Sequence, residues 1–172
     1  MHRIQGRTGL RAAVIALGLV AWTATAAMAS PLTYSTSGQI NATGVSPSDA
    51  AVISFVPLTG NTVDLASGQT NVSLGNFVVS SPGSASTTYT DTPFQISFLP
   101  QSYNHEAVNN DPQNPNVVQL TGKLNGVVSG PSSSTVIARF DPISDPHFSL
   151  GAAGTANLNL PTGSLLLAPS TS

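Results

Sequence analysis

The sequence contains no cysteine, and charged residues make up only 7% of it. Without cysteine neither a disulfide framework nor thiol catalysis is available, so the fold must be stable through its core alone. Glu106 is the only glutamate and Lys123 the only lysine. Exposed helix surfaces are usually built from Glu, Lys, Arg, Gln and Ala. The scarcity of Glu, Lys and Arg argues against a helical fold.

The first 29 residues have the pattern of a secretory signal peptide. Three arginines precede an apolar run over residues 12–22, and a string of small residues ends at Ala29, which is the order of features in a cleavable leader. The apolar run is about half the roughly 20 residues that a membrane-spanning helix needs. We therefore expect a helical signal peptide at residues 1–29, then a single domain at residues 30–172 with no membrane span. The mature chain is expected to be secreted or extracellular, in the periplasm or at the cell surface.

Few cationic groups remain once the leader is removed. Only Lys123 and Arg139 then stand against all seven carboxylates of the chain, which gives a formal net charge of −5. Nucleic acids and anionic membranes are bound by clustered Lys and Arg side chains. The charge therefore excludes nucleic acid as a partner.

Serine, threonine, glycine and proline are abundant instead, and apolar residues alternate with polar ones. Over residues 117–128 the even positions are apolar or glycine, whereas the odd positions from 119 to 125 are polar, as in a strand with one buried face. A Gly-Pro turn follows, and residues 135–140 alternate again, so the two runs predict a hairpin. Gly122 and Gly126 within the first run indicate a bend, a bulge or a close backbone approach.

Further short runs predict the other strands. They are Leu32–Ile40 with a break near Gly38, Ala51–Phe55, Val72–Val79, Phe94–Phe98, Ala156–Leu160 and Leu165–Leu167. About eight to ten short strands separated by turn residues are typical of an all-β domain, either a β-sandwich or a jelly roll.

A long irregular stretch, Leu99–Pro115, is the first place to look for a site, because long loops in compact domains are often functional. Tyr103 and His105 are the candidate ligand-binding residues there. Oxygen ligands of the kind that calcium prefers cluster in the same stretch and in a second one further on. This candidate calcium set is Glu106, Asn109, Asp111, Asp141 and Asp145. The competing interpretation, which we favour, is that Asn and Asp here are turn residues that cap local backbone, with no cofactor.

Catalysis has little support in the sequence. His105 and His147 are the only histidines after the leader, and no Gly-x-Ser-x-Gly motif occurs. Sugar binding is an alternative, with Tyr89 and Tyr103 expected at loop positions where their rings could stack on a sugar. The competing interpretation is that both rings pack at the edge of the hydrophobic core. We therefore predict that the chain is not an enzyme.

The segments Thr92–Phe98, Leu120–Gly130 and Phe140–Ser144 resemble ectodomains of bacterial exported proteins of the PEP-CTERM (exosortase-substrate) kind. The resemblance implies a Ser/Thr-rich β domain bound for the envelope or matrix, and it supplies no catalytic residue. The printed sequence differs in having no Pro-Glu-Pro motif and no apolar C-terminal helix. The resulting hypothesis is a non-enzymatic β-sandwich with a structural or adhesive role at the cell surface or in extracellular matrix, meeting polysaccharide or other surface proteins. The alternative is a carbohydrate- or calcium-binding module that uses the 99–115 loop.

Overall fold

The structure is a computed structural model, and it describes most of the chain after residue 29. The described residues are 30–47, 51–65, 70–80, 82, 85–108, 116–129, 133–160 and 164–167. The predicted signal peptide lies outside them, as do the candidate ligands Asn109 and Asp111. The described part contains thirteen strands and a single short 3-10 helix, η1 (Gly151–Ala153). The predicted all-β fold is confirmed.

Most strands belong to one antiparallel sheet. The strands are β1 (Pro31–Ile40), β2 (Val45–Ser46), β3 (Ile53–Val56), β4 (Asn61–Asp64), β5 (Asn76–Val79), β6 (Ser86–Tyr103), β7 (Glu106–Ala107), β8 (Val118–Ser129), β9 (Ser133–Ser134), β10 (Ile137–Phe140), β11 (His147–Ser149), β12 (Thr155–Asn157) and β13 (Ser164–Leu166). The main sheet has the order β13-β10-β8-β6-β1-β4, with β2 and β7 also pairing with β6, and β9 with β8.

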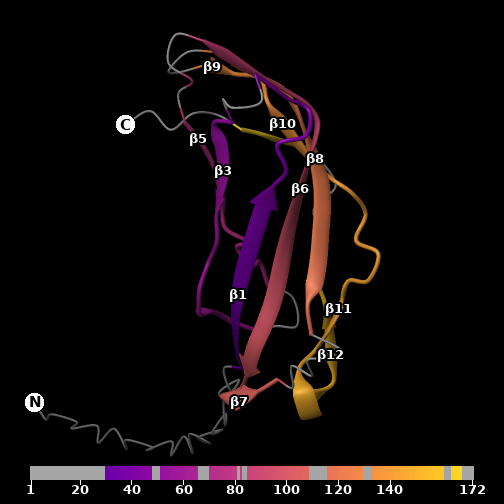
Figure 1. Cartoon of the computed structure of the whole chain (residues 1–172). Coiled ribbons are helices and arrows are strands. Elements are labelled where there is room, and N and C mark those ends of the chain that lie inside the picture. Colours follow the sequence, from indigo (N-terminus) through magenta and orange to yellow (C-terminus); the bar gives the residue numbers. More distant parts are fainter. Residues whose placement is uncertain are drawn as a thin grey trace, which may run out of the picture.

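Two small sheets complete a sandwich-like arrangement. The β3–β5 pair packs beside β1, and the β11–β12 pair lies near the end of the main sheet where β6 turns into β7 (Figure 1). The strands are less uniform than the sequence predicted. β6 runs for 18 residues and β8 for 12, and these two long neighbours form the centre of the sheet.

The expected hairpin is present in β8 and β10, which pair antiparallel with Ala138 opposite Leu124. Alternation along β8 buries Val118, Leu120 and Leu124 and leaves the odd positions 119 to 123 exposed, as predicted. Gly126 has a φ of 134° and lies where the β6–β8 register shifts, which is the bulge that its presence indicated.

That register shift changes which side chains of β6 face the core, from odd-numbered to even-numbered positions. Thr90 and Asp91 together oppose Asn125 alone, so β6 carries one extra residue here, and Asp91 adopts a left-handed φ of 46°. Before the shift the odd positions Thr87 and Tyr89 are buried, and after it the even positions from Thr92 to Phe98 are buried. Asparagine and aspartate tolerate this backbone conformation better than other side chains do, and the Asn125 side-chain oxygen accepts a hydrogen bond from the Asp91 N–H at 2.9 Å.

Proline within a central strand usually breaks the ladder, yet Pro93 stands inside β6. Its carbonyl accepts a hydrogen bond from the Asn41 N–H, just beyond the end of β1 at Ile40. The N and O of one strand residue point to the same side, so the donor that proline lacks would face the segment after β1. The strand therefore loses no regular β1–β6 ladder bond at Pro93.

Glycines in the sheet make room for aromatic rings. A Cβ at Gly38 would lie 2.3 Å from a ring carbon of Phe55, and one at Gly122 would lie 2.4 Å from the tip of Phe94. The predicted break near Gly38 is wrong, because β1 continues through it to Ile40. The glycine serves ring packing there. The close backbone approach that Gly122 indicated is confirmed, because a Cβ there would also lie 2.2 Å from the Arg139 carbonyl oxygen.

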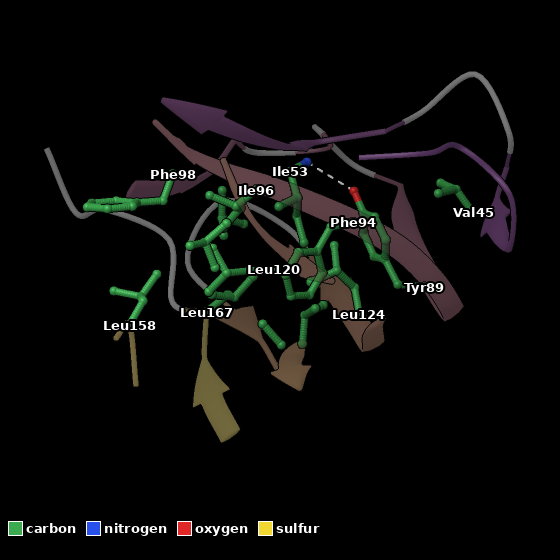
Figure 2. Close-up of a cluster of buried hydrophobic side chains, with 14 of the residues drawn as sticks. Val45, Ile53, Tyr89, Phe94, Ile96, Phe98, Leu120, Leu124, Leu158 and Leu167 are labelled. Atoms are coloured by element: carbon green, nitrogen blue, oxygen red, sulfur yellow. Dashed lines mark hydrogen bonds between the residues drawn. The ribbon is translucent and has the colours of Figure 1, made fainter. Parts of the chain in front are cut away.

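The rings form a chain that links the layers. Phe55 contacts Phe77, Phe77 contacts Phe94, and Phe94 contacts Phe140, all edge-on, with centroids 5.1 to 5.5 Å apart. Edge-to-face pairs at this separation are favourable beyond their burial. Figure 2 shows Phe94 in the cluster with Leu120, Leu124 and Ile53. The chain crosses from β3 through β5 and β6 to β10.

Two tyrosine hydroxyls tie the β3–β5 side to the main sheet. The Tyr89 hydroxyl accepts hydrogen bonds from the backbone N–H groups of Val52 and Ile53 at 2.9 and 3.0 Å. Figure 2 shows the bond from Ile53. The Tyr34 hydroxyl donates to the Ser73 carbonyl at 2.8 Å. The expectation that Tyr89 lies in a loop is wrong, because it is a core residue of β6 that is 2% exposed.

Three of the shorter predicted strands begin or end elsewhere. The Val72–Val79 strand begins only at Asn76, Ala51 is exposed before β3 starts, and the Ala156–Leu160 strand ends at Asn157. Local apolar runs do not reveal where cross-strand partners are available. The strand expected at Leu165–Leu167 exists as β13, which pairs with β10.

Replacing Tyr89 by phenylalanine is expected to destabilise the fold by about 1–3 kcal/mol, because two backbone N–H groups lose their acceptor in a buried place. The free energy of unfolding from urea titration measures the loss. Tyr103→Phe is the matched control, expected within about 0.5 kcal/mol, because the Tyr103 hydroxyl has no hydrogen bond to the described residues. Equal losses for the two variants would contradict the role given to Tyr89.

Candidate functional site

The Leu99–Pro115 stretch is only partly a loop. β6 continues through Tyr103 and turns back into β7 over two residues, Asn104 and His105. Their φ values of 50° and 67° are those of a type I′ turn, whose twist suits a two-residue hairpin. The long loop expected from residue 99 is therefore wrong up to residue 108, and residues 109–115 lie outside the described part.

Tyr103 and His105 point to different environments. Tyr103 is half-buried and packs against the core, whereas His105 is exposed at the turn. Tyr103 also lines a recess of about 700 Å³ at this end of the sandwich, together with Leu32, Phe148 and Leu158. Most residues of its lining are apolar, and Asn157 is among the polar ones. The structure gives His105 no part in that lining.

The three described acids of the candidate calcium set are separately placed on the surface. Glu106 is exposed in β7, Asp141 accepts a hydrogen bond from Thr121, and Asp145 is bonded to His147. Within the described ranges no three His, Asp or Glu side chains lie close enough to hold a metal ion. Asp145 makes the local hydrogen bond to backbone that turn carboxylates typically make, whereas Asp141 bonds across the sheet to Thr121.

Asp145 and His147 form a small, exposed hydrogen-bonded unit before β11. The carboxylate accepts the backbone N–H of His147 at 3.1 Å and lies 3.1 Å from ring Nδ1 of the same residue. The backbone hydrogen bond and then the ring contact lower the pKa of Asp145 below its usual 3.8. Because the folded pKa is depressed, the interaction is complete above pH 3.8 and is lost as the pH falls through the lower folded pKa.

The Asp145 carboxyl is expected to titrate below pH 3.8, and His147→Ala to return its pKa part of the way. The recovery is incomplete because the backbone N–H at position 147 remains as a donor. Side-chain carboxyl chemical shifts in an NMR pH titration measure both values. An unchanged Asp145 pKa in the variant would show that the ring makes no contribution.

The broad outward face of the main sheet was not identified as a site from the sequence. At its centre the side chains form rows across the strands, because paired residues on neighbouring strands face the same way. Gln39 lies opposite Gln95, and Gln95 lies opposite Thr121. Asp141 continues this row, because its N–H donates to the Thr121 carbonyl. The polar odd positions of β8 were the available signal, but only the pairing register shows which residues share a row.

Side-chain hydrogen bonds hold these rows in place. Gln95 Nε2 donates to Gln119 Oε1 at 2.6 Å, and the Ser97 hydroxyl donates to the same oxygen at 3.0 Å. Thr121 Oγ1 donates to Asp141 Oδ2 at 3.0 Å. The arrangement can donate and accept several hydrogen bonds from a fixed surface. It has no nucleophile paired with a base among its members.

No protein-family model, curated protein or solved structure matches the chain. Among the described residues no helix has the length and apolar character needed to cross a bilayer.

Proposed function

We propose that the chain is an exported, non-enzymatic β-sandwich domain with a structural or adhesive role at the cell surface or in extracellular matrix. The observation that carries the proposal is the outward sheet face, where side chains from β1, β6 and β8 form hydrogen-bonded rows. Side chains that are already held by hydrogen bonds to one another lose little conformational entropy when a partner binds. The entropic cost of binding at this face is therefore small.

The charge distribution supports contact with uncharged or mixed surfaces. Lys123, one of the two cations after the leader, has its Nζ 3.9 Å from a carboxylate oxygen of Asp91 on the same face. The face is otherwise built of Gln, Ser and Thr side chains near its centre. Arg139, the other cation after the leader, lies opposite Lys123 on this face. Two cations with Asp91 and Asp141 on the same face are too few for the clustered positive charge that binds nucleic acid or an anionic bilayer.

Other surface proteins are a second class of partner, through a sheet edge. β13 is the terminal strand of the main sheet, and its Leu165 and Leu166 are 51% and 61% exposed. An edge strand with apolar side chains can receive a strand from another chain. Export itself rests on the predicted signal peptide at residues 1–29.

The test measures the fraction of the exported chain that stays bound to the extracellular matrix of the cells that produce it. The full-length chain is expressed with a C-terminal tag, and its processed N-terminus is expected at Ser30 in the extracellular fraction. A Ser97→Glu/Gln119→Glu variant is expected to be retained at least about fivefold less, since two charges on the contact face must be desolvated.

The matched control is Ser144→Glu/Thr155→Glu, which adds the same charge at two exposed positions outside the rows. It is expected to be retained like the parent chain. Equal retention of all three proteins, or an unprocessed chain that stays inside the cell, would contradict the proposal.

A further inference from the structure

A shallow recess of about 260 Å³ lies within the outward face. Its polar lining comes from β1, β6 and β8, which are neighbours in the main sheet (Figure 1), and from the segments that follow β1 and β10. These polar residues are Gln39, Asn41, Gln95, Thr121, Lys123 and Asp141, and Pro93 lies between them. We infer that this recess binds a neutral polysaccharide, with the sugar chain lying across the strands. The inference rests on the proposed function and names its ligand class.

The register makes the recess a two-row grid. One row is Gln39, Gln95, Thr121 and Asp141, as described above. The second row runs from Asn41, whose N–H donates to the Pro93 carbonyl, to Lys123 opposite Pro93 and Arg139 opposite Lys123. Neighbouring strands are about 4.8 Å apart, so polar groups recur along a line perpendicular to the strands. A ligand with regularly repeated hydroxyl groups can engage several of them at once.

The hydrogen bonds within the recess leave capacity for a ligand. Gln95 donates one amide N–H to Gln119, and its Oε1 accepts one hydrogen bond from Gln39 Nε2 at 3.5 Å. An amide side chain has two donors and two lone pairs, so each of these glutamines keeps unused groups. Asp141 uses one carboxylate oxygen for Thr121 and retains the other. Sugar hydroxyls both donate and accept, which matches this mixed set.

Charge favours a neutral polymer over a charged one. Lys123 and Arg139 are balanced on this face by Asp91 and Asp141, and the chain after residue 29 carries a formal −5. A polyanion would meet Asp141 and the overall negative charge, and a polycation would meet Lys123 and Arg139. The half-buried ring of Pro93 provides a small apolar surface for the C–H face of a sugar.

No exposed aromatic ring lines this recess, so each single site is expected to bind weakly. An insoluble polysaccharide presents many equivalent binding positions at high local concentration, so even weak binding is detected as retention. Insoluble polysaccharides are the appropriate probes for this reason.

The experiment measures retention of the purified exported chain on cellulose, chitin, starch and a β-1,3-glucan, with the acidic polymer alginate as a fifth probe. At least one neutral polymer is expected to retain the parent chain, and alginate to retain none. Gln95→Ala and Asp141→Ala are each expected to lower binding by about fivefold, as expected for loss of one hydrogen-bonding partner. Gln101→Ala is the matched control, because it removes the same exposed side-chain type from β6 outside the recess.

The inference would be overturned by no retention on any neutral polymer, by retention on alginate alone, or by equal losses for Gln95→Ala and Gln101→Ala. Melting temperatures of the variants confirm that they fold. If Gln95→Ala instead lowers self-association in sedimentation, the recess is a contact between copies and the inference is wrong. Matrix retention in the preceding assay without retention on neutral polymers would remove this inference and leave the proposed function standing.

Discussion

The structure depends on the packing of one ring against one glycine. Phe55 of β3 lies on Gly38 of β1, so closely that a Cβ at that glycine would overlap the ring. Phe55 then begins the chain of edge-on rings that ends at Phe140 on β10. Because interiors are packed to crystal-like density, this contact fixes how the β3–β5 pair sits on the main sheet.

The inward packing also determines the outward face. A slip of one residue in a strand would move its entire apolar set to solvent, so the ring contacts of Phe94 and the burial of Leu120 and Leu124 fix the β6–β8 register. The rows of Gln, Ser and Thr on the other face follow from that register. The bulge at Thr90 and Asp91 allows β6 to keep an apolar inner face on both sides of the shift. The arrangement of polar side chains on the outward face is therefore a consequence of core packing.

Strand identity was predictable from the sequence where alternation was strict, as in the residues that became β8, β10 and the middle of β6. Features that depend on a distant partner were not predictable. Gly38 was interpreted as a strand break because the ring of Phe55, which explains it, comes from another layer. Tyr89 was placed in a loop because the bulge after it changes the buried positions from odd to even. The alternation that Phe94 and Phe98 indicate therefore does not extend back to position 89. The recess could not be anticipated, since Gln39, Gln95 and Asp141 become neighbours only through the register.

A double-mutant cycle on Gly38 and Phe55 tests the central claim most directly, with the free energy of unfolding as the measured quantity. In the parent chain Gly38→Ala is expected to cost about 1–3 kcal/mol, the usual penalty for overpacking. In a Phe55→Ala background most of that penalty is expected to disappear, which gives a coupling of about 1 kcal/mol or more. The same penalty in both backgrounds would contradict the packing of Phe55 on Gly38 as the contact that positions the second layer.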